Sequence, residues 1–320
     1  MKNFWQTLDK PFFVLAPMED VTDVAFRALI AEHKAPDVTF TEFTSADGLL
    51  LAKGDGLKKL ERKLEFTERE RPIVAQLFSS VPEYMEEICS RVAKKGFDGI
   101  DINMGCPIKN IVDQGCGAAM IKNPEAAKEI IRAAKRGAGD IPVSVKTRVG
   151  YSKDEEMDAW VRDLLSEDIA ALTIHARTRK DMSKVPARWE LVKQAVEIRD
   201  EMGVSTLILG NGDAENITDA RKKVRESGCD GVMLGRAIYG NPWLFLDRKD
   251  EPTREERIEA LLKHLDLFQE KMADVTNYAV MKKHFKAYIT GWDNAKDLRA
   301  SLMETENTNE ATEILANSLK

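Results

Sequence analysis

Gly99-Ile-Asp-Ile-Asn-Met-Gly-Cys-Pro107 couples a short apolar run to a loop that carries a thiol. The part from Gly99 to Met104 is typical of a strand that is buried in a sheet. Asn103 and Cys106 fall where this strand ends. Because Cys106 precedes a proline, its backbone is disfavoured in helical geometry, and we expect it to be extended. For a cysteine taken alone, a small buried residue before a turn is the simpler interpretation. Whether Cys106 belongs to a functional site therefore depends on the rest of the chain.

Seven further runs resemble this strand and lie about 25 to 40 residues apart, with stretches of helical periodicity between them, such as Pro82–Lys95 and Pro124–Arg136. Eight βα units favour a TIM (β/α)8 barrel of the α/β class. The alternative, an open doubly wound sheet, needs a glycine-rich turn after the first strand, where this chain has Ala16-Pro-Met-Glu19. The predicted strands are Phe12–Ala16, Val38–Thr41, Ile73–Leu77, Gly99–Asn103, Val143–Lys146, Ala171–His175, Thr206–Leu209 and Gly231–Leu234.

The pattern changes near the end of the chain. From Thr253 to Lys320 there is no strand signal, and apolar positions such as Ile258, Leu261 and Leu265 follow helical spacing. We therefore predict a barrel over residues 1–248 and a C-terminal all-helical domain of about four helices over residues 249–320.

Composition indicates a soluble protein of the reducing cytoplasm. Hydrophobic residues make up 43% of the 320 residues and charged residues 32%. No apolar run approaches the roughly 18 to 20 residues that span a bilayer, and the N-terminus lacks the apolar core of a signal peptide. The four cysteines are too scattered for a disulfide framework or a zinc site. We accordingly expect neither a metal nor a membrane partner.

Net charge is −6, but positive groups gather in two places. Five basic residues stand against one acid between Arg177 and Arg188, and Lys282-Lys-His-Phe-Lys286 forms a second cluster. A solvated face is the simpler interpretation of each cluster alone. Nucleic-acid binding remains open, because it depends on where positive groups lie and not on their total.

Polar side chains occupy nearly every strand end, which is where a TIM barrel holds its active site. Gly210-Asn-Gly-Asp213 and Gly235-Arg236 follow the seventh and eighth strands, where such barrels often bind a phosphate. Lys146 and His175 project towards the same mouth, as does Gln76 from the third strand. Together they suggest a phosphorylated redox cofactor whose identity spacing alone leaves open.

With these residues in view, the chain resembles the tRNA-dihydrouridine synthase family, flavoenzymes that reduce specific uridines in tRNA. The Asn-Met-Gly-Cys-Pro form is closest to the bacterial B-type branch. The stretches that carry the resemblance are Ala16-Pro-Met-Glu-Asp-Val-Thr-Asp23, Asp101-Ile-Asn-Met-Gly-Cys-Pro107, Gly115-Cys-Gly-Ala-Ala119, Val145-Lys-Thr-Arg148, Ile174-His-Ala-Arg-Thr-Arg179, Gly210-Asn-Gly-Asp213, Leu234-Gly-Arg-Ala237, Gly240-Asn-Pro-Trp243 and Met281-Lys-Lys-His284.

The resemblance implies an FMN cofactor, NADPH or NADH as reductant, and tRNA as substrate, with no obligatory protein partner. Reduced flavin would deliver hydride to C6 of uracil, and Cys106 would donate the proton to C5. Asn103 and Arg177 would face the uracil, and Lys282 and Lys283 would contact tRNA. The cofactor-binding residues that it implies are Pro17, Met18, Gln76, Lys146, His175, Asn211, Gly212, Asp213, Gly235 and Arg236.

Two other hypotheses stay open at this point. An FMN barrel could act on a free small molecule of the dihydroorotate or dihydropyrimidine type, against which the helical segment and the basic clusters count. The chain could also be an RNA-binding flavoprotein without turnover, but Cys106, Asn103 and Arg177 argue against that. Cys116, where the family more often has a plain small residue, has no predicted role.

Overall fold

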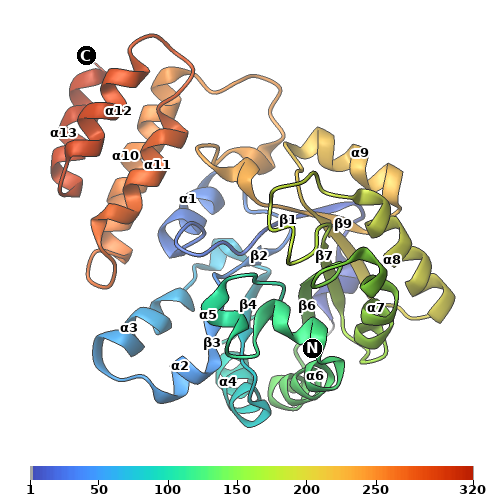
Figure 1. Cartoon of the computed structure of the whole chain (residues 1–320). Coiled ribbons are helices and arrows are strands. Elements are labelled where there is room, and N and C mark those ends of the chain that lie inside the picture. The colour runs from blue at the N-terminus through green and yellow to red at the C-terminus, as the bar shows by residue number, and fades with distance from the viewer. Residues whose placement is uncertain (1–2, 320) are drawn as a thin grey trace.

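The structure, a computed structural model that describes residues 3–319, is built around one parallel sheet that curls into a nearly closed barrel (Figure 1). Neighbouring strands follow the order β1-β9-β8-β7-β6-β5-β4-β2, and a bridge between Val14 and Val38 brings the first strand back to the second. The strands are β1 (Phe12–Leu15), β2 (Thr39–Phe40), β3 (Thr44–Ser45), β4 (Ile73–Phe78), β5 (Gly99–Met104), β6 (Val143–Arg148), β7 (Ala171–His175), β8 (Leu207–Asn211) and β9 (Gly231–Leu234).

Alternate residues of the strands face two separate apolar layers, as the period of two in a strand requires. In β1, Phe12 and Val14 belong to a cluster with Trp5, whereas Phe13 and Leu15 pack in the larger cluster under the helices. Trp5 lies in a short 3₁₀ helix, Phe4–Thr7, and is buried. Apolar side chains thus fill the barrel interior, and the open strand ends are left for polar chemistry.

Helices surround the sheet, and their start signals are those expected from sequence. Asp23 accepts a hydrogen bond from Phe26 N at the start of α1, and Asn123 does the same for Ala126 N before Pro124 of α6. The barrel helices are α1 (Val24–Lys34), α2 (Ala46–Leu51), α3 (Gly54–Lys63), α4 (Pro82–Lys94), α5 (Lys109–Val112), α6 (Pro124–Ala138), α7 (Met157–Leu165), α8 (Trp189–Met202) and α9 (Ile217–Ser227).

The described residues of the C-terminal part form helices joined by short loops, with no strand among them, as predicted. It contains α10 (Arg254–Lys271), α11 (Lys282–Tyr288), α12 (Ala295–Glu304) and α13 (Thr308–Ser318), which lie together on one side of the barrel beside α1 (Figure 1). A capping box between Thr253 and Glu256 starts α10. The division of the chain at residues 248 and 249 into two domains stays a prediction.

Each of the eight predicted strands overlaps an observed one, but several run further towards the site than expected. The predicted strand Thr206–Leu209 ends instead at Asn211. Gly210 therefore lies inside the strand and not after it, and a Cβ there would lie 2.2 Å from a ring carbon of Trp189, so tertiary packing requires glycine. The two-residue strand β3 was not predicted, because it is too short to show a period. Among the described residues, no helix combines the length and apolar character needed to cross a membrane.

Candidate active site

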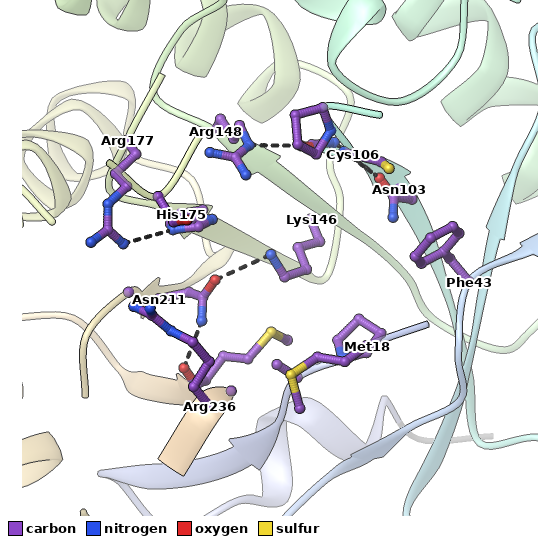
Figure 2. Close-up of a pocket in the computed structure, with 18 of the residues that line it drawn as sticks. Met18, Phe43, Asn103, Cys106, Lys146, Arg148, His175, Arg177, Asn211 and Arg236 are labelled. Atoms are coloured by element: carbon purple, nitrogen blue, oxygen red, sulfur yellow. Dashed lines mark hydrogen bonds between the residues drawn. The ribbon is translucent and has the colours of Figure 1, made fainter. Parts of the chain in front are cut away.

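A cavity of about 400 Å³ opens at the carboxyl ends of the barrel strands. This volume suits a small-molecule ligand. The structure brings all thirteen barrel residues predicted for the site to its wall: Pro17, Met18, Gln76, Asn103, Cys106, Lys146, His175, Arg177, Asn211, Gly212, Asp213, Gly235 and Arg236. Figure 2 shows the labelled side chains among them, such as Lys146, His175 and Asn211, converging from separate strands on one space.

Cys106 sits on a loop that hydrogen bonds hold on both sides. Its backbone N–H donates to Asn103 Oδ1 at 2.9 Å, and its carbonyl accepts from Ala118 N at 3.0 Å. Burial raises the pKa of the Cys106 thiol above its ordinary value, although the Ile108 backbone N–H and Arg148 oppose this effect. The thiol is therefore protonated at neutral pH and able to act as an acid.

A buried polar chain supports Asn103 from below. Asn103 Nδ2 donates to Gln76 Oε1 at 3.0 Å, and Gln76 Nε2 donates to Asp101 Oδ2 at 2.7 Å. Ser144 Oγ completes the chain by donating to the other Asp101 oxygen at 2.6 Å. Burial raises the pKa of Asp101 to about 6, against the opposing effect of its hydrogen bonds. These hydrogen bonds thereby orient the Asn103 amide, which in turn positions the loop of Cys106.

Lys146 projects from β6 into the middle of the cavity (Figure 2). Its Nζ donates to Asn211 Oδ1 at 3.2 Å, and Asn211 Nδ2 donates to the Met233 carbonyl at 2.8 Å. Burial, together with the nearby Arg148 charge, lowers the pKa of Lys146 to about 8. Most of its ammonium form still persists at neutral pH, so a positive charge faces any bound ligand.

His175 and Arg177 meet at the end of β7. Arg177 Nη1 lies 3.2 Å from His175 Nε2. Because a guanidinium has no acceptor, Nε2 must carry the lone pair and Nδ1 the proton. Burial and the surrounding cations, Lys146 first among them, lower the pKa of His175 well below its ordinary value, so the ring is neutral. A neutral imidazole thus presents an Nδ1–H donor at the site.

Asp213, just after the end of β8, forms ion pairs with two arginines. Arg177 forms a short ion pair with Asp213 Oδ2, and Arg236 Nη2 lies 2.6 Å from Asp213 Oδ1. Burial would raise the pKa of Asp213, but the hydrogen bond from Arg177 and the surrounding charges hold it below its usual value. The carboxylate therefore orients both guanidinium groups.

The wall beside Arg236 is made of backbone at Gly212 and Gly235. Gly212 has φ +125°, and a Cβ there would approach the Ala187 Cβ to 2.8 Å, so this position requires glycine. Bare backbone beside an arginine at the last two strand ends has the donor chemistry of a phosphate site.

The predicted tRNA contacts lie apart from the cavity, on α11. Lys283 is exposed, whereas Lys282 is half-buried and its Nζ donates to the Met303 carbonyl at 2.7 Å. In the other basic cluster, between Arg177 and Arg188, part of the positive charge is not available to a nucleic acid. Arg177 is buried and paired, and Arg188 forms ion pairs with Asp154 and Asp181. Asp213 and Asp154, which are distant in sequence, and Asp181 within the cluster neutralise these two cations. Only Lys180 and Lys184 of the cluster are exposed.

Sequence reasoning left several lining residues unassigned, Arg148 and Phe43 among them. Arg148 lines the cavity from the end of β6, beyond the predicted end of that strand at Lys146, and burial lowers its pKa to about 10. Phe43 lines the opposite wall from a segment without a recognisable motif (Figure 2). Arg148 could have been found, because it is the third polar residue of Lys146-Thr-Arg148. Cys116 is buried outside the cavity wall, and burial raises the pKa of its thiol to about 11.

Carboxylates cluster at one place that the sequence did not indicate. Oxygens of Glu19, Asp20 and Glu42 lie within 4.8 Å of one another. Glu42 accepts a hydrogen bond from Asp20 N at 2.6 Å, and Glu19 pairs with the ammonium of Lys63. The carboxylates of Glu19 and Glu42 therefore have partners within the protein.

Comparison with known proteins places this site in a family. Residues 14–320 match the family described as Dihydrouridine synthase (Dus). The chain belongs to the dihydrouridine synthase family. It is 42% identical over 315 residues to the probable tRNA-dihydrouridine synthase of Staphylococcus aureus (strain COL), covering 98% of this chain and 95% of that protein. The probable tRNA-dihydrouridine synthase 2 of Bacillus subtilis (strain 168) is 43% identical, with 98% and 96% covered.

Two solved structures resemble this member of the dihydrouridine synthase family in fold alone. Histamine dehydrogenase from Rhizobium sp. 4-9 superposes with a TM-score of 0.55 at 14% identity, covering 80% of this chain and 49% of that one. Morphinone reductase in complex with tetrahydroNAD gives a TM-score of 0.51 at 15% identity, covering 77% and 90%. They support the barrel architecture predicted from sequence.

Proposed function

We propose that this chain reduces specific uridines of tRNA to 5,6-dihydrouridine, with FMN as bound cofactor and NADPH or NADH as reductant. The observation that carries the proposal is Cys106. It is a protonated thiol on a fixed loop at the wall of a cavity of ligand size. The chain also belongs to a family named for this reaction. The tRNA substrate implies the cytoplasm as the compartment.

FMN would bind along the wall from β8 to β1. Asn211, Gly212, Gly235 and Arg236 would hold the phosphate, with Asp213 keeping Arg236 in place. The cavity residues assigned to the isoalloxazine are Pro17, Met18, Gln76, Lys146 and His175. Bound flavin, once reduced, supplies the hydride for C6 of the uracil.

The chain's own residues would complete the reduction. Addition of hydride at C6 leaves an enolate that needs a proton at C5, and the Cys106 Sγ–H provides it. The Arg177 guanidinium and the neutral Asn103 amide would orient the uracil. The Lys146 ammonium would offset the negative charge that develops on the uracil oxygens. The thiolate left on Cys106 returns to the thiol by taking a proton from solvent.

tRNA would lie across the barrel mouth and the C-terminal helices. The target base must leave the stack to reach the cavity, at a cost of a few kcal/mol. Phosphate contacts from residues 249–320, Lys282 and Lys283 among them, would offset that cost. This assigns the helical segment to tRNA binding and the barrel to catalysis.

The proposal is tested by purifying the protein and measuring its bound flavin, its turnover with unmodified tRNA and its turnover with free uridine. We expect a yellow protein that releases FMN on denaturation, and that oxidises NADPH with formation of dihydrouridine in unmodified tRNA. Free uridine should give little turnover. Turnover on free uridine matching that on tRNA would favour a small-molecule oxidoreductase, and a tRNA-binding flavoprotein without product would be non-catalytic.

Arg236→Ala tests the cofactor site directly. It removes a charge-assisted phosphate contact, worth roughly 1.5 to 3 kcal/mol, so FMN should dissociate at least tenfold more readily in a flavin-titration experiment. Arg225→Ala, an exposed arginine of α9 outside the cavity wall, serves as control. Equal FMN affinity in both variants would remove Arg236 from the phosphate site.

A further inference from the structure

Two loops at the cavity mouth expose large apolar side chains. Ile108 is 51% exposed and lines the cavity directly after Cys106-Pro107. Met182 is 36% exposed and precedes Ser183, which also lines the cavity. The described part of the chain has only three other large apolar side chains this exposed, and all three lie outside the cavity wall. Two large apolar side chains beside one cavity offer an apolar surface to a ligand that crosses its mouth.

One buried arginine ties these two loops together. Arg148 Nε donates to the Gly105 carbonyl at 2.8 Å, and its Nη1 donates to the carbonyls of Thr178 at 3.1 Å and Met182 at 3.0 Å. Figure 2 shows the guanidinium beside the cysteine loop. These three hydrogen bonds from one rigid, planar group fix the loop of Ile108 against the loop of Met182.

The backbone at Met182 supports the same conclusion. Its φ is +57°, in the left-handed region. The other non-glycine residues with positive φ in the described chain are all Asp or Asn, whose short side chains tolerate this conformation. Met182 has no such side chain, so the surrounding contacts, Arg148 among them, must hold it there.

Positive charge surrounds the apolar side chains. Lys180 and Lys184 are exposed on the loop of Met182, and Lys109, which pairs with Asp113, begins α5 directly after Ile108. Nearby, Lys122 Nζ and the Arg179 guanidinium lie 4.8 Å and 5.3 Å from the ring centre of Tyr151. Apolar contact groups ringed by cations match nucleotides, which combine an apolar base face with a phosphate.

We propose that Ile108 and Met182 cover the bases on either side of the target uridine once that uridine enters the cavity. The inference rests on the proposed function. A cavity of about 400 Å³ leaves no room for the neighbouring nucleotides, so the strand on both sides must cross the mouth. Removing one base from a stack exposes the faces of its neighbours, and apolar side chains can replace the lost stacking contacts. Ile108 and Met182, which we call the rim, thereby favour binding of a uridine within a strand over binding of free uridine.

The test uses the FMN-loaded protein and two single-stranded RNA 9-mers with a central uridine. One has adenosines beside the uridine, and the other has abasic riboses there, which keep the phosphates and remove the flanking bases. Affinities are measured by competition against labelled tRNA. Wild-type protein should bind the adenosine-flanked probe about tenfold more tightly, equivalent to about 1.4 kcal/mol. The variant with Ile108→Ser and Met182→Ser should reduce that ratio to within about twofold, through weaker binding of the adenosine-flanked probe alone.

Leu246→Ser, at a 42% exposed leucine outside the cavity wall, is the matched control and should keep the full ratio. FMN content and unchanged affinity for the abasic probe show that the rim variants are folded. Met182→Ser alone, on the loop that does not carry Cys106, provides a second variant that should lower the ratio in part. A ratio near one in wild-type protein, or a full ratio in the rim variants, would overturn the inference. Absence of dihydrouridine from wild-type protein and tRNA would instead overturn the proposed function.

Discussion

Burial shifts the two most reactive side chains of the site towards their neutral forms, in opposite pKa directions. The pKa of Cys106 rises and that of Lys146 falls to about 8. At pH 7 the thiol keeps its proton while most of the lysine keeps its charge. A proton donor and a positive charge therefore coexist in one cavity, as protonation of an enolate requires. Their separate roles can be distinguished by substitution and by pH.

Cys106→Ala should lower dihydrouridine formation by about 10² to 10⁴-fold, the usual contribution of a general acid. FMN content, flavin reduction by NADPH and tRNA affinity should persist, because the loop is held by backbone groups and Asn103. Mass spectrometry of tRNA after single turnovers measures the loss. Cys116→Ala, at a thiol outside the cavity wall, should keep most activity. Near-normal turnover in Cys106→Ala would assign the proton to water or another side chain.

Activity should fall as pH rises through about 8, because Lys146 loses its charge there. The Cys106 thiol, with its raised pKa, remains protonated in the same range. Rates of product formation between pH 6 and 9.5, at constant FMN occupancy, test this. Lys146→Met should be slower at pH 7 and lack the decline near pH 8. The same decline in that variant would assign it to another group.

At the scale of elements, α1, α10 and α11 share an aromatic contact without polar partners. His264 of α10 stacks on Phe26 of α1 with ring centres 4.8 Å apart, and His284 of α11 lies 4.6 Å from His264. Both nitrogens of His264 are buried without a hydrogen-bond partner. Burial lowers the pKa of His284 to about 3 and that of His264 well below its ordinary 6.5. The contact between barrel and helical segment therefore requires neutral imidazoles.

This contact predicts acid-sensitive stability. Below pH 6.5 the unfolded chain protonates both histidines while the folded chain does not, so stability is lost as pH falls towards 3. Each histidine should contribute about 1.4 kcal/mol per pH unit well below 6.5. Urea unfolding at pH 7, 6 and 5 measures this slope. His264→Phe should lower the slope, whereas His33→Gln, at an exposed histidine of α1, should leave most of it. An unchanged slope in His264→Phe would contradict the assignment.

At the scale of the molecule, the C-terminal helices extend the surface on the α1 side of the barrel (Figure 1). Ion pairs join the two parts, since Lys58 and Arg62 of α3 both contact Asp274 after α10. Net charge is −6, so any tRNA surface must be local. The lysines of α11 and the exposed Lys180 and Lys184 at the cavity mouth are the groups that we assign to it.

Replacing Lys282, Lys283 and Lys286 by alanine should weaken tRNA binding and reduce its dependence on salt by up to about three units of slope. Lys282 also bonds to the Met303 carbonyl, so its share should be the smallest. Filter binding at several salt concentrations measures the slope, and flavin reduction should be normal. Lys94 and Lys95, exposed at the end of α4, provide the control substitution. A slope unaffected by the triple substitution would place the tRNA surface elsewhere.

Local information determined much of this protein. Eight apolar runs at βα spacing predicted the barrel, because a strand that is buried on both sides must be apolar throughout. Polar residues directly after those runs predicted the cavity wall, since parallel strands end at one edge. Both inferences depend on residues that are adjacent in sequence, and the residues named for the wall all lie there.

Only the tertiary structure decided which polar groups are engaged with one another. Asp213 forms ion pairs with Arg177 and Arg236. Asn103 supports the loop of Cys106, and Arg148 joins two loops that lie far apart in the chain. Burial then set the protonation of Cys106, Lys146 and His175. Hydrogen bonding and desolvation depend on neighbours brought together by folding, and a residue's identity in the sequence does not specify those neighbours.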